Sequence, residues 1–194
     1  DETRQLYIIT DVTELVKQQT LECIEGLRKY DEGTIVVNGK TGIQLQSSSL
    51  PVHIKPMEAI KLFAKWNHTY IDDAMLKALG IKEMKESQYI ELSTGQKKKI
   101  TLALALISNP DIIFLDEPTA GLDVEGRLSL HEQIRKLKSQ GKTIVLASHD
   151  MAEVETLCDR IAILNSGKIV FCGTPSELTD RLGRKYFIHL KTQD

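Results

Sequence analysis

Two acidic residues at the end of an apolar run are the first candidates for chemistry. The run from Ile112 to Leu115 is short enough for a buried strand, and Asp116 and Glu117 follow it directly. Neighbouring strand residues point to opposite sides, so one carboxylate can support Mg²⁺ while the other faces an attacking water. This division suits phosphoryl transfer. An acidic pair before Pro118 can also simply end a strand and cap the next element.

A second apolar run, Thr143 to Ala147, ends in Ser148, His149 and Asp150. In open parallel sheets, ligands bind beyond the carboxyl ends of the strands, so these polar residues are candidates for the same site. His149 alone is also compatible with an ordinary loop histidine ahead of a helix cap formed by Asp150 and Glu153.

The pentapeptide LSTGQ is a third candidate. Ser93 and Gln96 form an S-x-x-Q capping box, which predicts the start of a helix that runs to Ile107. With Gly95 inside it, such a start also offers free backbone N–H groups and the positive end of the helix dipole to an anion. The two interpretations are compatible. We expect the next three lysines, 97–99, to lie on a solvated face.

The elements that must position these residues alternate between strand and helix patterns, which predicts an α/β fold with a parallel sheet. The hairpin of residues 160–173 turns at Asn165 to Gly167, and residues 47–88 form a helical insert. Strands are expected at 6–12, 34–40, 42–46, 112–115 and 143–147, and helices at 57–65, 71–79, 97–107, 124–140, 151–158 and 175–182.

Composition limits the possible partners. The 194 residues include 25 basic and 27 acidic side chains, so no overall charge attracts nucleic acid. The three cysteines form no CxxC pair, which fits a reducing, cytosolic compartment. No apolar stretch approaches the roughly 20 residues of a membrane-spanning helix, so we expect a membrane role to require a partner.

The order and spacing of these motifs carry a family resemblance. The segment ELSTGQKKKITLALALISNPDIIFLDEPTAGLD, followed by TIVLASHD, resembles the ATP-binding cassette (ABC) ATPases, and the similarity extends over nearly the whole chain. The resemblance implies a P-loop NTPase-like fold: a mostly parallel sheet flanked by helices, with an antiparallel β part and a small helical subdomain. It also implies ATP and Mg²⁺ as cofactors.

The same resemblance implies a role for each motif residue. LSTGQ resembles the signature motif, with Thr94 in place of the usual Gly. Asp116 is expected to support Mg²⁺, Glu117 to act as the general base, and His149 to contact the γ-phosphate. The remaining expected contacts are Gln46, which touches the metal as the Q-loop glutamine, Thr20 at the end of the phosphate loop, Ser93, Gly95 and Gln96 of the signature, and Asp123 of the D-loop.

The sequence departs from the family at two joins. The phosphate loop G-x-x-x-x-G-K-[ST] should lead into Thr20 but is absent, and a connection that contains a helix is reduced to Thr41. We interpret both as segments missing from the sequence, and we therefore expect a chain break near Gln19–Thr20 and another near Lys40–Thr41.

By resemblance, the predicted function is that of the ATP-hydrolysing subunit of an ABC membrane transporter, with an exporter of the ABC-2 multidrug kind favoured. Expected partners are a transmembrane permease and a second cassette, with no nucleic acid, on the cytoplasmic face of the membrane. Alternatives are a degenerate non-hydrolytic cassette and a soluble cassette of translation; the short insert disfavours a chromosome-maintenance ATPase. We divide the chain into a β part with the first core helix (1–46), a helical subdomain (47–91), the signature and ATPase core (92–174) and a C-terminal extension (175–194).

Overall fold

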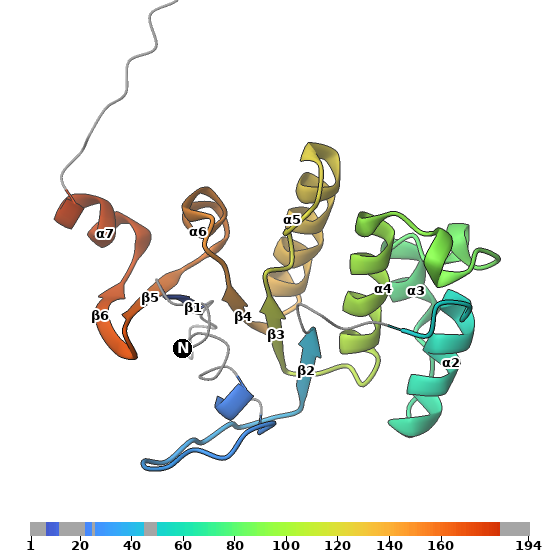
Figure 1. Ribbon diagram of the computed structural model, residues 1–194, viewed down its shortest axis with the longest axis horizontal. Helices are drawn as coiled ribbons and strands as arrows, with labels where there is room; N and C mark the ends of the chain where they lie inside the picture. The colour runs from blue at the N-terminus through green and yellow to red at the C-terminus, as the bar shows by residue number, and fades with distance from the viewer. Residues whose placement is uncertain (1–6, 12–21, 25, 45–49, 183–194) are drawn as a thin grey trace, which may run out of the picture.

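A six-stranded sheet forms the centre of the computed structural model, which describes residues 7–11, 22–24, 26–44 and 50–182 (Figure 1). The strand order is β2-β3-β4-β1-β5-β6, and all neighbours are parallel except β5 and β6. The fold class predicted from the sequence is therefore confirmed, and the antiparallel part is the hairpin at one edge. The strands are β1 (Tyr7–Asp11), β2 (Thr41–Gln44), β3 (Ile112–Asp116), β4 (Thr143–Ala147), β5 (Arg160–Asn165) and β6 (Lys168–Gly173).

The central strands are apolar on both faces because both faces are covered. In β3, Leu115 belongs to the main hydrophobic core, while the preceding Phe114 belongs to a smaller cluster with Ala147 and Leu164. The β3–β4 register places Asp116 beside Ala147. The first polar residues after these two runs therefore meet at one edge of the sheet.

Six helices with numbered labels surround the sheet or extend from it (Figure 1). A long α5 and a short α6 follow β3 and β4, as the βαβ pattern predicts. The helices are α2 (Pro56–Trp66), α3 (Asp73–Ala78), α4 (Thr94–Leu106), α5 (Val124–Ser139), α6 (Met151–Leu157) and α7 (Pro175–Leu182), with 3₁₀ turns at Lys82–Met84 and Tyr89–Glu91. One further helical turn covers residues 22–24.

The predicted helical insert packs on α4 and lies to one side of the sheet (Figure 1). Ile60 of α2 and Leu76 of α3 are fully buried in the same core as Ile100 of α4. The Asp72 carboxylate begins α3 by accepting hydrogen bonds from the backbone N–H groups of Ala74 and Met75. Helix α4 therefore joins the helical part to the sheet.

A glycine allows α4 to approach β2 closely. A Cβ on Gly42 would overlap the carbonyl oxygen of Ala105 and crowd the ring of Pro110. Just before β2, the Lys40 N–H donates to the Asp111 carboxylate, and the Lys40 carbonyl accepts from the N–H of Ile112 at 3.1 Å. The chain thus runs directly from Lys40 into the β2–β3 ladder, and the predicted break near Lys40–Thr41 is wrong.

One predicted strand is absent. Residues 34–40 adopt no strand, and Val36 within them is 73% exposed. Residues that favour strands form one only against a partner, and no described strand pairs with this segment. The predicted strand at 42–46 corresponds to β2, although residues 45 and 46 lie outside the described part of the chain.

Candidate functional site

Two buried carboxylates stand at the carboxyl end of β3. Asp116 is the last residue of the strand, and the N–H of Glu117 donates to the carbonyl of Ala147 at 2.9 Å, which extends the β3–β4 pairing by one residue. Only 8% of Asp116 and 3% of Glu117 are exposed. The predicted acidic pair therefore lies in a largely water-excluded position.

His149 completes this group. Its Nδ1 lies 3.0 Å from Oε1 of Glu117, and its side chain is 81% exposed whereas that of Glu117 is 4% exposed. The structure thus brings together Asp116, Glu117 and His149, three residues predicted from the sequence. The histidine can meet a ligand from the solvent side while it contacts the buried carboxylate.

The backbone of Glu117 is strained. Its φ angle is +45°, in the left-handed region that residues with a Cβ rarely adopt. Its carbonyl oxygen accepts from the N–H of Ala120 at 3.2 Å and from Nζ of Lys98 at 3.0 Å. Such strain marks functional sites and persists where the surroundings fix the conformation.

Lys98 does not lie on a solvated face, so this part of the prediction for the three lysines is wrong. Its side chain crosses from α4 to the turn after β3 and is half-buried. Burial lowers the pKa of Lys98, and the carboxylates of Asp116 and Glu117 oppose that shift because they favour the charged amine.

A buried carboxylate that the sequence analysis treated as a helix cap is the centre of a polar network. Glu153 Oε2 accepts hydrogen bonds from Ser148 Oγ at 2.7 Å and from Thr119 Oγ1 at 3.1 Å, and Oε1 lies 3.3 Å from Nε2 of His131. The capping of α6 is done by Asp150, whose Oδ1 accepts two backbone N–H bonds. Glu153 therefore connects α5, α6 and the loops after β3 and β4.

The start of α4 has the predicted capping box. Ser93 Oγ accepts from the N–H of Gln96 at 3.2 Å, and Gln96 Oε1 accepts from the N–H of Ser93 at 2.9 Å. A concave pocket of about 430 Å³ lies beside it and brings together all four predicted contacts in this region. The lining residues include Ser93, Gly95, Gln96, Lys99, Gly121 and Asp123. One Asp123 oxygen also caps α5 through the N–H of Gly126.

Two predicted site residues, Thr20 and Gln46, lie outside the described residues, as does the predicted join at Gln19–Thr20. Within β2, Gln44 is only 1% exposed, and neither polar atom of its side chain has a hydrogen-bond partner in the described part of the chain. The alternation of apolar and polar residues in the sequence did not predict that this amide is buried.

The position of β1 in the sheet indicates where the missing phosphate loop would lie. β1 lies between β4 and β5 and ends at Asp11, at the same edge of the sheet as Asp116. The sequence between Asp11 and Gly26 contains no glycine, so G-x-x-x-x-G-K-[ST] does not follow β1. The phosphate loop is therefore absent from the position directly after β1, where the sheet topology would place it.

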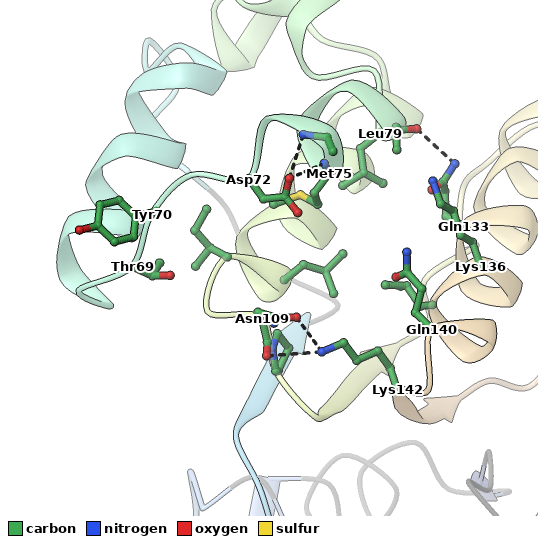
Figure 2. Close-up of a pocket in the computed structure, with 16 residues that line it drawn as sticks. Thr69, Tyr70, Asp72, Met75, Leu79, Asn109, Gln133, Lys136, Gln140 and Lys142 are labelled. Atoms are coloured by element: carbon green, nitrogen blue, oxygen red, sulfur yellow. Dashed lines mark hydrogen bonds between the residues drawn. The ribbon is translucent and has the colours of Figure 1, made fainter.

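A second pocket, of about 200 Å³, lies between α3, the end of α4 and α5 (Figure 2). Lys142 Nζ donates to Asn109 Oδ1 across its lower side at 2.7 Å, and Gln133 Nε2 donates to the carbonyl of Ala78 at 3.2 Å. Asn109 and Lys142 precede β3 and β4, so this pocket lies toward the amino ends of the strands and away from Asp116.

The donor chemistry at β3 fits Mg²⁺. Magnesium prefers oxygen ligands and is commonly held by one or two carboxylates together with phosphate oxygens and water. No group of three or more His, Cys, Asp or Glu side chains in the described part of the chain could hold a metal without such help. Asp116 therefore suits an ion that arrives with a phosphate ligand.

These features define a class of protein. It has an α/β fold with acidic and histidine side chains at the carboxyl ends of parallel strands, and a helix N-terminus whose free backbone N–H groups suit an anion. A family model described as ABC transporter matches residues 17–120. The chain belongs to the ABC transporter family.

Curated relatives agree with this assignment. An ABC transporter ATP-binding protein of Methanocaldococcus jannaschii is 35% identical over 172 residues, covering 86% of this chain and 66% of the relative. The linearmycin resistance ATP-binding protein of Bacillus subtilis is 31% identical, covering 90% and 62%, and a Nod factor export ATP-binding protein I of Burkholderia orbicola is 31% identical, covering 84% and 60%. The chain thus spans about three fifths to two thirds of these relatives.

Solved structures show the same fold. The ATP-binding subunit of an ABC transporter superposes with a TM-score of 0.79 at 22% identity, covering 92% of this chain and 82% of that chain. A bacterial ABC transporter cassette, described as dimeric, gives a TM-score of 0.76 at 23% identity, covering 88% and 85%.

Proposed function

We propose that this chain is part of the ATP-binding and ATP-hydrolysing subunit of an ABC exporter. The observation that carries the proposal is the contact between His149 and Glu117 beside Asp116, at the carboxyl edge of the sheet. Asp116 would hold Mg²⁺ with the phosphates of ATP, and Mg²⁺ when bound would neutralise charge on them. The relatives named for linearmycin resistance and Nod factor export support the exporter assignment.

In this proposal the residues have separate roles. Glu117 orients the attacking water and takes its proton, and its burial keeps bulk water from competing for the carboxylate. His149 contacts the terminal phosphate from the exposed side. Gln46 and Thr20 are assigned to the metal and the phosphates by their position in the motifs alone.

The signature pocket is assigned to the nucleotide of a second cassette. The pocket beside Ser93 and Gln96 presents the N-terminal amides and positive dipole of α4, which suit phosphate oxygens. Two cassettes facing each other would place two ATP molecules between a signature pocket and a β3 edge. The dimeric solved cassette of the same fold supports this arrangement.

The proposed membrane partner is a transmembrane permease, which the cassette would contact at the cytoplasmic face of the membrane. No helix in the described part of the chain is both long and apolar enough to cross a bilayer. In this proposal the permease would bind the transported substrate, and the cassette would supply the energy of ATP hydrolysis.

The test begins with the intact wild-type protein, because the sequence lacks the phosphate-loop motif G-x-x-x-x-G-K-[ST]. We expect Mg²⁺-dependent ATP binding and turnover, with a rate per chain that rises with protein concentration as dimers form. Glu117→Gln should keep ATP binding and lose about 10²- to 10⁴-fold in turnover. Glu132→Gln, an exposed carboxylate on α5, is the control.

The outcomes separate the alternatives. ATP binding without turnover in the wild-type protein would identify a non-hydrolytic cassette. Failure to bind ATP would refute the proposal, and wild-type turnover in Glu117→Gln would show that another group is the base.

A further inference from the structure

Helix α4 contributes to two places in the fold at once. Its first turn lines the signature pocket through Ser93, Gly95 and Gln96. One turn further along, Lys98 extends to the other side and donates from Nζ to the carbonyl oxygen of Glu117 at 3.0 Å. A single helix thus contacts both the pocket for one nucleotide and the turn that carries the base for the other.

The contact is made to a backbone that needs support. Glu117 carries a Cβ and adopts the left-handed conformation, which persists only where several contacts fix it. The N–H of Glu117 is held by Ala147, and its carbonyl is held by the N–H of Ala120 and by the ammonium group of Lys98. Hydrogen bonds from a charged donor are about twice as strong as neutral ones.

The orientation of the base depends on this turn. The Glu117 side chain leaves a backbone fixed at both its N–H and its carbonyl, and it reaches Nδ1 of His149 at 3.0 Å. A shift of about 1 Å in a catalytic group can cost about 10²-fold in rate. A change at the carbonyl of Glu117 would therefore be transmitted to its carboxylate.

We propose that Lys98 is a positioning residue for Glu117, and that it mechanically joins the signature end of α4 to the general base of the same chain. The proposal rests on the proposed function for its catalytic consequence. In a pair of cassettes, the signature start would contact one ATP while Glu117 serves the other, and the Lys98 side chain connects α4 to the turn that carries Glu117. If α4 moves when ATP binds at the signature pocket, Lys98 would displace the turn after β3 that carries Glu117 at the other nucleotide site.

The test uses three variants of the intact protein. Lys98→Met removes the ammonium group and keeps the apolar stem, whereas Lys98→Arg keeps a cation. Lys97→Met is the matched control, because Lys97 Nζ lies over the Tyr89 ring, 5.3 Å from its centroid, and not at the Glu117 carbonyl. Lys98→Met should lower kcat about ten-fold or more and change ATP affinity far less, since the ammonium group contacts the turn that carries the base. Lys98→Arg should recover most of the rate.

A double variant shows whether Lys98 acts through Glu117. In a Glu117→Gln background, Lys98→Met should cause no further loss of the residual turnover. A further loss there, or a kcat for Lys98→Met equal to that of Lys97→Met, would overturn the proposal. Weaker ATP binding with unchanged kcat would also overturn it.

Hydrogen exchange provides a readout that needs no turnover. The Ala120 amide donates to the Glu117 carbonyl, so it should exchange faster in Lys98→Met, while amides in the middle of α4 keep their wild-type rates. Unchanged exchange at Ala120 would refute the positioning role. If the wild-type protein does not hydrolyse ATP, the proposed function fails, and exchange at Ala120 alone decides this inference.

Discussion

Replacement of Glu153 by alanine is the most informative single perturbation of this fold. The carboxylate is 2% exposed and is bonded to Ser148, Thr119 and His131, whose exposures are 0%, 5% and 7%. Alanine would remove the acceptor for two buried hydroxyl groups and the partner of the imidazole. Each buried polar group left unsatisfied costs about 1–3 kcal/mol, so the expected loss is about 3–5 kcal/mol of unfolding free energy.

The isosteric change Glu153→Gln separates the hydrogen bonds from the charge. The amide oxygen can still accept from Ser148 and Thr119, and the amide nitrogen can donate to a neutral His131. We therefore expect Glu153→Gln to cost no more than about 1.5 kcal/mol. For comparison, a protein domain is stabilised by about 5–15 kcal/mol in total, so the alanine variant should lose a substantial part of its stability.

Urea denaturation of the two variants, followed by far-UV circular dichroism, measures both losses. Glu155→Ala is the matched control, because Glu155 is an exposed residue of the same helix and its replacement should change the free energy by less than about 0.5 kcal/mol. Equal midpoints for Glu153→Ala and Glu155→Ala would refute the role assigned to the network. A large loss in Glu153→Gln would show that the charge, and not the set of hydrogen bonds, is what the fold requires.

Three further expectations concern other buried positions. Burial raises the pKa of the Cys158 thiol, so a maleimide at neutral pH should label the exposed Cys172 and the partly exposed Cys23 and leave Cys158 unreacted until urea unfolds the chain. The double variant Cys23→Ser/Cys172→Ser should then show no labelling before unfolding, and rapid labelling of Cys158 in it would contradict the burial. Gly42→Ala should lower the free energy of unfolding by at least about 1–3 kcal/mol in urea denaturation, because its methyl group would overlap a carbonyl of α4. The control Thr41→Ala, at the exposed neighbouring position, should lower it by less than about 1 kcal/mol. Equal losses in the two variants would contradict the close packing of α4 on β2. Gln44→Met should stabilise the protein by about 1–2 kcal/mol in the same assay, because it removes a buried amide that has no hydrogen-bond partner among the described residues. A destabilised variant would indicate that the amide does have a hydrogen-bond partner.

The sequence predicted the elements that are strongly patterned. The apolar runs ending at Asp116 and Ala147 correspond to adjacent parallel strands, and the S-x-x-Q box at Ser93 begins a helix. These features depend on local chemistry, namely apolar continuity and capping, and are therefore visible in a short window of sequence. The acidic pair and His149 follow the strands, so the sheet edge brings them together.

What the sequence did not predict depends on contacts between distant residues. Lys98 is one of three consecutive lysines, and only the position of the turn after β3 distinguishes it from its neighbours. Glu153 stands where a capping residue would, but its carboxylate turns toward Thr119, 34 residues away in the chain. The expected strand at 34–40 failed for the same reason, because strand propensity without a partner does not form a ladder.

The pairing of β2 with β3 has a consequence for the order in which the chain assembles. The bond between Lys40 and Asp111 joins residues 71 positions apart, and the whole helical part with α4 lies between them. Closing a flexible loop of that length costs about 4 kcal/mol in chain entropy, so β2 gains from pairing only after the intervening helices have compacted the loop. At a synthesis rate of about 5–20 residues per second, β2 leaves the ribosome roughly 4 to 14 s before its partner strand. During that interval β2 has neither β3 nor the end of α4 to cover it, and a chaperone can bind there.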